Sequence, residues 1–426
     1  MHSTPRIAEK IKVGAPAEGV ALLSFRASVK DIVTLGGSFL GGKRFNPPDN
    51  PMVAPLTVAM LDEGTRRHSR DAIRKALSRR GATIDFACGG ERVYFTARCL
   101  AEHLGEVVEF LAEQVREPRF GAKEFAAAKR RETGKHKLEH EDTRARAEQS
   151  LVAALYPQGH PNFEPPADKK IAALERTSRA NLAALHRRFG RGSLIVTAAG
   201  AVSHEELAAH LARRFGDWKK TALAPAASAE RDRRLSRTLR VNVPVADKAS
   251  VDLMVGEYAG ITREHPDFYA LFLGLQVLGG GGFTGRLMQR VRDQQGLTYG
   301  VYAGLDGFSD GADGYWYVWG TFAPALRARG EEAVRRELRE FSRHGITAGE
   351  LAMKKESLAG QYLVSLGTTA ALAATMLKNA EEGRAPDFLD EYPDILRRLT
   401  LEEVNTAIRR YVHPERATIV AAGAVH

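Results

Sequence analysis

This sequence of 426 residues lacks any uninterrupted apolar run of about 18 residues, the length that a membrane-spanning helix needs. Its N-terminus, MHSTPRIAEKIK, also lacks the apolar core of a secretory signal peptide. We therefore expect no membrane partner and a cytoplasmic protein, or a periplasmic one if a leader has been removed. Because the chain is too long for one ordinary core, we expect two or more domains.

Cysteine is nearly absent, since Cys88 and Cys99 are the only two in the sequence. A small secreted protein held together by disulfides needs more cysteines than this. Without an export signal, the two residues are expected to be free thiols.

Acidic residues are fewer than basic ones, and the net charge of +10 raises the question of nucleic-acid binding. The 62 basic residues are spread along the chain among 52 acidic ones, mostly on predicted helix faces, where charge is ordinarily solvated. The densest basic segment, 66–80, carries Ile73 and Leu77 four residues apart, which predicts a surface helix docked by one edge. Charge alone discriminates poorly, so we predict no nucleic-acid partner.

The predicted elements follow the same order twice along the chain. In each half, strands come first, a run of helices follows, and an apolar strand closes the half, at 193–199 and at 418–422. Gly89 and Gly90, between two strand-like segments, mark a hairpin turn. Strands that arrive as hairpins and helices that arrive in runs are typical of α+β domains with largely antiparallel sheets.

Two sequence markers recur at nearly the same spacing. Ala-Ala-Gly at 198–200 reappears 223 residues later, and the segment 120–126 has a counterpart 226 residues later. This offset predicts two tandem homologous domains of about 200 residues each. We expect them over 1–218 and 239–426, joined by a linker, 219–238, in which Ala, Pro, Ser and charge dominate.

The stretch 278–304 carries the most information. Four glycines, 279–282, run into an amphipathic segment, and a segment rich in aromatic and β-branched residues follows. Gly296 can take the left-handed position that ends a helix, so we predict a helix up to that residue and a strand directly after it. Arg292 and Tyr299 then lie on adjoining elements, where a guanidinium and a phenol can meet.

Each feature of this stretch also has an ordinary explanation. A glycine-rich loop that opens a helix can cradle phosphate, but neither the Walker nor the dinucleotide pattern is met. Glycines also let backbone segments pass closely or flex. Arg292 can be solvated on a helix surface, and Tyr299, which shares a strand face with Val301 and Ala303, can be a core aromatic.

The run GRLMQRVRDQQGLTYGVYA, with the duplicated α+β domain, resembles the M16 metallopeptidase family, the pitrilysin and mitochondrial-processing-peptidase group. The family's second domain has a glycine-rich turn, an Arg-Leu pair, and an Arg and a Tyr seven residues apart, as Arg292 and Tyr299 are here. The resemblance implies the two-domain M16 fold over essentially the whole chain. It also implies that Arg292 and Tyr299, with Gly281 and Gly282 of the glycine loop, bind a peptide substrate.

Zinc-binding members of the family carry His-x-x-Glu-His in the first domain, followed by a Met and then Gly-Thr. Two histidines four apart on a helix can reach one zinc, and the Glu between them acts as general base. Aligned on Met60, this chain has Pro55, Val58 and Ala59 at the ligand and base positions. None of these can bind a metal or move a proton, so we predict no metal in this chain.

One literal His-x-x-Glu-His occurs at 136–140, which begins 81 residues after Pro55 and lacks the following Met and Gly-Thr. That place corresponds roughly to the helix on which the family carries its third ligand, a Glu. The surrounding run is strongly charged, which is typical of a solvated helix face. We predict that His136 and His140 bind no zinc.

The resemblance therefore implies a subunit that has lost the metal and kept the Arg/Tyr pair. In this family the active cleft forms between the zinc-bearing first domain of one unit and the second domain of another. We expect a heterodimeric metalloendopeptidase in which a partner with His-x-x-Glu-His supplies zinc and the general base, and in which this chain, inactive alone, supplies Arg292 and Tyr299. The substrate is expected to be an unstructured peptide. The alternative is a non-proteolytic structural or peptide-binding subunit, resembling the core proteins of the respiratory cytochrome complex.

Overall fold

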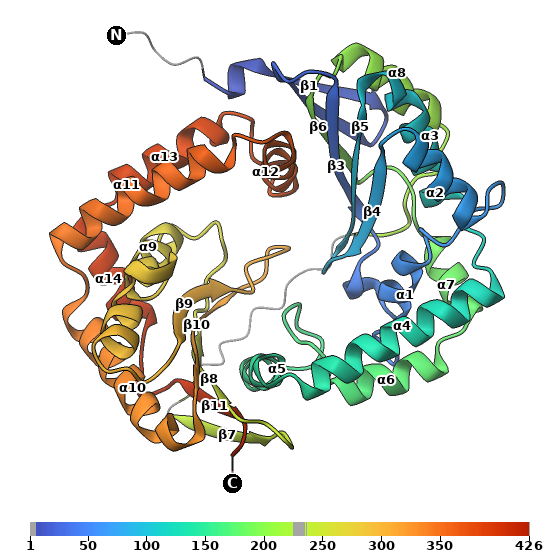
Figure 1. Cartoon of the computed structure of the whole chain (residues 1–426). Helices are drawn as coiled ribbons and strands as arrows, with labels where there is room; N and C mark the ends of the chain where they lie inside the picture. Colours follow the sequence, from blue (N-terminus) through green and yellow to red (C-terminus); the bar gives the residue numbers. More distant parts are fainter. Residues whose placement is uncertain (1–5, 225–234, 236, 426) are drawn as a thin grey trace. The chain divides into compact units, whose positions relative to one another are not determined.

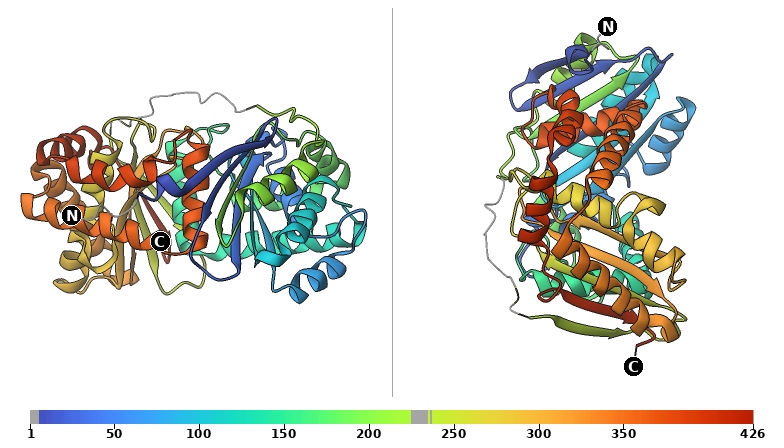
Figure 2. Two further views of the ribbon diagram at one scale, coloured as in Figure 1. Left: turned by 90° about the horizontal axis from the view of Figure 1, so that it is seen from above. Right: turned by 90° about the vertical axis from the view of Figure 1, so that its left-hand side faces the viewer.

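The computed structural model describes residues 6–224, 235 and 237–425, and the chain forms two compact units (Figures 1 and 2). Unit 1 consists of Met1–Gly134, Lys170–Ala226 and Gln361–Tyr392, and unit 2 consists of Lys135–Lys169, Ala227–Gly360 and Pro393–His426. Each unit thus combines parts of both halves of the sequence. The predicted boundaries at 218 and 239 follow the order of the chain and stay a prediction, and part of the predicted linker lies outside the described residues.

Unit 1 is built on a six-stranded sheet in the order β1-β2-β6-β3-β5-β4. Its strands are β1 (Ile11–Ala17), β2 (Val20–Arg26), β3 (Ile32–Leu40), β4 (Thr83–Cys88), β5 (Arg92–Leu100) and β6 (Leu194–Gly200). β2 and β6 run parallel, while the other neighbouring pairs are antiparallel. The predicted hairpin at Gly89 and Gly90 is confirmed between β4 and β5; the sequence pattern does not predict β1.

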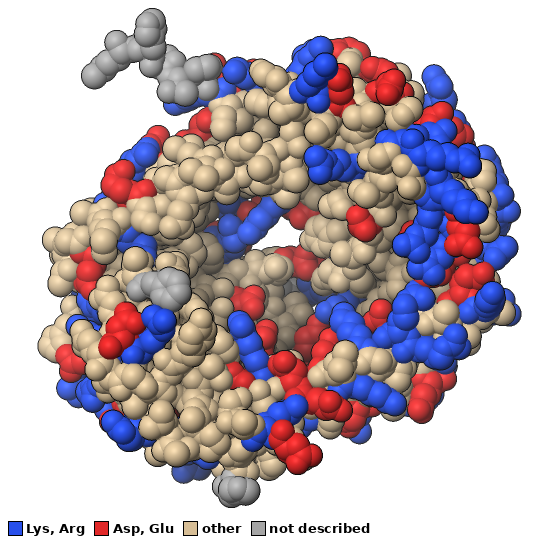
Figure 3. All heavy atoms as spheres, viewed as in Figure 1, with Lys and Arg blue, Asp and Glu red and all other residues tan. Residues whose placement is uncertain are grey.

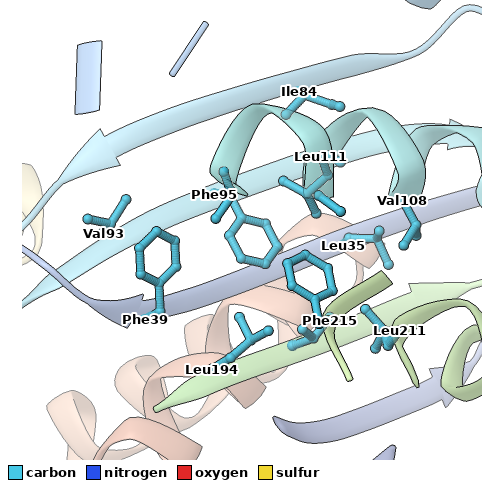
Figure 4. Packing of buried hydrophobic residues seen from close by; sticks show 14 of the residues in the cluster. Leu35, Phe39, Ile84, Val93, Phe95, Val108, Leu111, Leu194, Leu211 and Phe215 are labelled. Carbon is cyan, nitrogen blue, oxygen red and sulfur yellow. The ribbon is translucent and has the colours of Figure 1, made fainter. Parts of the chain in front are cut away.

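One face of this sheet is covered by helices that share an apolar core with it. These helices are α1 (Val53–Ala59), α2 (Arg70–Arg79), α3 (Leu104–Arg116), α7 (Arg179–His186) and α8 (His204–Phe215). Phe39 of β3 and Phe95 of β5 point from the sheet toward Leu111 of α3 and Phe215 of α8 (Figure 4). All four side chains are almost fully buried, so α3 and α8 are held against the sheet by a close-packed core.

Unit 2 is built on a five-stranded sheet in the order β7-β11-β8-β10-β9. Its strands are β7 (Leu239–Pro244), β8 (Val251–Tyr258), β9 (Gly300–Asp306), β10 (Tyr315–Phe322) and β11 (Thr418–Gly423). Helices α9 (Phe268–Leu278), α10 (Arg327–His344) and α14 (Leu401–Tyr411) share a core with one face of it. β7 and β11 are parallel and the other pairs antiparallel. Apart from β1, the two sheets have the same strand order, which confirms two homologous α+β copies.

The second face of each sheet packs against a helix from the other half of the sequence. In unit 2, α5 (Thr143–Leu155) contacts β8 and β11, and Leu151 is fully buried there with Met254 and Val420. In unit 1, α12 (Thr369–Glu381) contacts β3 and β6 through Ala373 and Met376. α5 and α12 are counterparts in the two copies, so the copies exchange one helix each.

A buried polar cluster holds the segment after α5 in unit 2. The Asp313 carboxylate lies 2.7 Å from Nε2 of His160 and accepts a hydrogen bond from the hydroxyl of Tyr258. The His160 ring stacks on Tyr156, whose hydroxyl donates to the Asp313 backbone oxygen at 3.0 Å. Burial alone would raise the pKa of Asp313, but the bonds from His160 and Tyr258 outweigh it and the pKa lies below its ordinary value.

The remaining helices are α4 (Ala122–Glu141), α6 (Ala167–Arg176), α11 (Ala348–Ser365) and α13 (Phe388–Arg398). The sequence pattern predicts α4 and α11 but not α6, α8 or α13. In the described part of the chain, no helix is both long enough and apolar enough to cross a membrane. Within the described residues, Cys88 and Cys99 are not joined by a disulfide.

The basic segment forms α2, which Ser69 caps by accepting a hydrogen bond from the Ala72 amide at 3.2 Å. Ile73 and Leu77 are buried, which confirms the surface helix docked by one edge. Lys and Arg side chains gather over the face formed by α2, α3 and α4, with acidic side chains among them (Figure 3). That the chain has no nucleic-acid partner stays a prediction.

Candidate functional site

The helix between α9 and β9 is irregular and short. After a 3₁₀ turn at Gly282–Thr284, a helix begins at Arg286 and widens into a π-helix at Met288–Asp293. Met288 and Val291 are fully buried, as the helical spacing predicts. Gly296 has the predicted left-handed conformation, with φ +63, and its N–H donates to the Arg292 carbonyl at 2.9 Å. π-Helical turns often occur at functional sites, because they displace the side chains that follow.

Arg292 and Tyr299 meet, a contact that the sequence only allows for residues on adjoining elements. Cζ of Arg292 lies 5.6 Å from the centre of the Tyr299 ring, within the range of a cation–π contact. Nη1 of Arg292 also donates a hydrogen bond to Oδ1 of Asp293 at 2.8 Å. The pair is therefore a defined arrangement of two strong hydrogen-bond donors.

The interpretation of Tyr299 as a core aromatic is wrong, because its side chain is 84% exposed while Val301 and Ala303 are buried. β9 begins at Gly300, one residue after Tyr299. The Thr298 hydroxyl accepts a hydrogen bond from the Gly300 N–H at 3.1 Å and delays regular strand pairing. Tyr299 thus precedes the strand and does not follow its alternation.

The glycine run combines close packing with an exposed turn. A Cβ on Gly279 would lie 2.6 Å from the backbone nitrogen of Ala303, and one on Gly285 would lie 2.8 Å from Cα of Gly279. Those two glycines let backbone segments pass closely, as one of the ordinary explanations predicts. Gly281 and Gly282 are exposed and left-handed, with φ +80 and +77. The preceding element is the helix α9, so the strand that a phosphate loop requires is missing at this place.

Helix α1 carries the positions that align with the zinc motif. Val58 is 2% exposed and belongs to the apolar core of unit 1, while Pro55 and Ala59 are partly exposed and lie four residues apart on one side of the helix. Pro55 is tolerated because it lies in the first turn, where its missing N–H breaks no helical bond. These three side chains offer no donor atom, so a zinc ion does not fit this helix.

The acidic residue that follows α1 has a structural role. Glu63 is 3% exposed, pairs with Arg131 and lies 3.4 Å from Nη1 of Arg70. In the same region Glu113 accepts a hydrogen bond from Thr65 and lies 2.9 Å from Nδ1 of His68. These carboxylates compensate basic and hydroxyl groups of unit 1.

The displaced His-x-x-Glu-His lies near the end of α4 with its two histidines in different environments. His136 is 5% exposed and its Nδ1 lies 2.6 Å from Glu139. His140 is exposed and lies 2.7 Å from a guanidinium nitrogen of Arg146. Among the described residues, no group of three or more His, Cys, Asp or Glu is placed to hold a metal. That this motif binds no zinc stays a prediction.

Sequence reasoning missed Lys354, which lies next to the glycine loop. It is 4% exposed, and its Nζ lies 3.4 Å from the carbonyl oxygen of Gly280. The available signal was periodicity, because Lys354 falls between Leu351 and Leu358 on the buried side of α11. A lysine in an apolar helical stripe is unusual and calls for a compensating group.

Comparisons with known proteins agree with this architecture. The family model described as "Insulinase (Peptidase family M16)" matches residues 22–162, and the one described as "Peptidase M16 inactive domain" matches residues 177–358. A solved structure of a peptidase M16 inactive domain from Pseudomonas fluorescens has a TM-score of 0.87 and 25% identity, covering 98% of each chain.

Curated relatives extend over most of the chain. An "uncharacterized zinc protease" of Mycobacterium tuberculosis is 25% identical over 352 residues, which are 82% of this chain and 79% of the relative. A "non-peptidase homolog" of Helicobacter pylori is 21% identical over 382 residues, which are 88% of this chain and 85% of the relative. Relatives described as zinc proteases and one described as a non-peptidase are thus both similar to this chain.

Proposed function

Because this chain belongs to the M16 peptidase family, we propose that it is the non-zinc-binding subunit of a heterodimeric zinc metallopeptidase. Arg292 and Tyr299 bind an extended peptide and stabilise the transition state of its hydrolysis, while zinc and the general base belong to the partner subunit. The observation that carries this proposal is the contact between the Arg292 guanidinium and the highly exposed Tyr299. Exposed beside a cation, Tyr299 is available to a ligand, to which it presents both an apolar ring and a hydroxyl donor.

Two donors of this kind suit peptide hydrolysis. Negative charge develops on the scissile carbonyl oxygen, and one positioned donor to it is worth about 3 kcal/mol. The phenol of Tyr299 can donate one hydrogen bond, and the guanidinium of Arg292 several. They bind the developing oxyanion or a neighbouring carbonyl of the substrate.

The neighbouring strand supports an extended substrate. β9 is a terminal strand of the sheet in unit 2, and Tyr299 immediately precedes it. A terminal strand leaves backbone groups that an extended peptide can pair with, which favours unstructured peptides over folded proteins. The exposed turn at Gly281 and Gly282 offers backbone without side chains, so it suits close approach of the peptide.

The residues of helix α1 take no part in the chemical step of this proposal. Pro55, Val58 and Ala59 supply neither a ligand nor a base, so the isolated chain is inactive under this proposal. The test is to mix the full chain with a family member from the same source that has His-x-x-Glu-His, and to follow cleavage of a fluorogenic peptide. Turnover that requires both chains supports the proposal, and turnover by the partner alone at the same rate contradicts it.

A second candidate is a peptide-binding subunit without proteolysis. It is favoured by the match to a domain described as inactive and by the relative described as a non-peptidase. In the same mixture, saturable peptide binding that depends on Tyr299 but leads to no cleavage supports this alternative.

A further inference from the structure

The ammonium group of Lys354 is buried, and the neighbouring described residues offer it little compensating negative charge. Only 4% of the residue is exposed, and its hydrogen bond to the Gly280 carbonyl is long, at 3.4 Å. Burial accordingly lowers the pKa of Lys354 from its ordinary value. Among the described residues, no carboxylate forms an ion pair with it. A buried cation without a compensating anion is costly.

The acidic residue one helical turn earlier on α11 is already engaged. Glu350 accepts two bonds from Arg286, Nε to Oε1 and Nη2 to Oε2, both at 2.5 Å. It also accepts the Thr347 N–H at 2.8 Å. Burial would raise the pKa of Glu350, but the bonds from Arg286 and Thr347 lower it to about 2. Glu350 therefore compensates Arg286 and leaves Lys354 without an anion.

Lys354 and Gln276 converge on one point beside the exposed glycine turn. A Cβ on Gly281 would lie 3.3 Å from Nζ of Lys354 and 3.9 Å from Oε1 of Gln276. Gly281 has no side chain to occupy this Cβ position, and the residue is exposed to solvent. A Cβ on Gly280 would lie 2.3 Å from the same Gln276 oxygen, so the amide packs tightly under the loop. An ammonium and an amide are thus presented beneath a turn that solvent reaches.

We propose that Lys354, Gln276 and the turn at Gly281 form a subsite for a carboxylate of the bound peptide. The ammonium supplies charge-assisted donors, the Gln276 amide can turn its N–H₂ toward the second oxygen, and the missing Cβ of Gly281 leaves room for the group. The subsite deepens the proposed function and rests on it, because it assumes that a peptide lies along the glycine loop. A carboxylate at this point compensates Lys354 as Glu350 compensates Arg286.

The carboxylate has two possible sources in a peptide, the C-terminus or an acidic side chain. Three peptides of otherwise identical sequence, each labelled with an uncharged fluorophore that has no carboxylate, separate them: one with a free C-terminus and no acidic residue, one amidated with no acidic residue, and one amidated with a central Glu. Binding to the full isolated chain is measured by fluorescence anisotropy, which requires neither the partner subunit nor turnover.

We expect a carboxylate-bearing peptide to bind at least about tenfold more tightly than the neutral peptide, since a charged hydrogen bond is worth about 1.5 kcal/mol or more. Lys354→Met should remove this preference and leave the neutral peptide unaffected. The matched control is Lys355→Met. Lys355 is the next residue on α11, but it is only partly buried and its Nζ donates to the Arg397 carbonyl at 2.8 Å, which is not part of the proposed subsite. Gln276→Met, which does not alter the charge, should reduce the preference about threefold, since it removes a neutral hydrogen bond.

The outcomes separate the two proposals. Equal affinity for charged and neutral peptides, or a preference that survives in Lys354→Met and Gln276→Met, overturns the subsite while peptide binding stands. No binding of any peptide to the isolated chain overturns the subsite, while the proposed function is tested separately by turnover in the mixture of both chains. The thermal midpoint of Lys354→Met should equal or exceed that of the unaltered chain, because methionine removes a buried charge.

Discussion

Nε2 of His160 and the carboxylate of Asp313 lie 2.7 Å apart in the interior of unit 2, although 153 residues separate them in the sequence. His160 follows α5, which comes from the first half of the chain, and Asp313 lies two residues before the strand β10. The pair therefore fastens an exchanged element to the sheet that receives it.

Because of Asp313, the free energy of unfolding of unit 2 should decrease at acidic pH. Its folded pKa lies below the ordinary value of 3.8, so its contribution is complete above that pH and is lost as pH falls toward the folded value. Asp313→Asn should lower the free energy of unfolding by about 2 kcal/mol at pH 7, because a buried charge-assisted bond is lost. The deficit should shrink below about pH 4. Urea unfolding at neutral pH and in acid measures both; Asp394→Asn, at an exposed ion pair with Arg397, is the control.

Arg292 and Tyr299 should each matter for turnover in the reconstituted complex. Because a positioned donor contributes about 3 kcal/mol to the transition state, Arg292→Ala and Tyr299→Phe should lower kcat/KM by about 10² to 10³. Peptidase assays measure this effect, and circular dichroism checks the fold. Tyr302→Phe removes a hydroxyl three residues further on, from a ring stacked on Trp319, and should change kcat/KM less than about twofold. Unchanged kinetics in both site variants would contradict the assigned roles.

The exchanged helix α5 should stabilise the strands of unit 2. Leu151 is fully buried against them, so Leu151→Ala should cost about 3 kcal/mol through a lost contact and a cavity. Hydrogen exchange should accelerate in β8 and β11 before it does in β3. Leu138→Ala is the matched control, since Leu138 is 70% exposed, and faster exchange confined to unit 1 would refute this expectation.

Removing metal should not affect the isolated chain. Pro55, Val58 and Ala59 offer no ligand, so its thermal midpoint should be the same with and without a chelator, and metal analysis should find no stoichiometric zinc. A tightly held zinc that disappears in His136→Ala or His140→Ala would show that the displaced motif binds metal.

Local pattern and spacing predicted a large part of this structure. The recurrence of Ala-Ala-Gly, the turn at Gly89 and Gly90 and the left-handed Gly296 each report on backbone geometry that a few neighbouring residues decide. The same short-range reasoning placed Arg292 and Tyr299 on adjoining elements, where they could meet. These features depend little on the rest of the fold.

What the sequence did not predict depends on longer-range packing. Periodicity does not reveal that α5 and α12 each pack on the sheet of the other copy, because an apolar stripe does not identify the surface that it packs against. Tyr299 is exposed just before β9, beside a local hydrogen bond that the Gly300 N–H donates to the Thr298 hydroxyl. The burial of Lys354 depends on the glycine loop above it, which periodicity alone does not place.

The reciprocal placement of α5 and α12 has a consequence for the origin of the chain. A gene encoding one copy would specify a sheet with an uncovered face and a helix without a surface to cover. Two such products could each complete the other, as in a domain-swapped homodimer. Tandem duplication would then join two already complementary subunits in one chain.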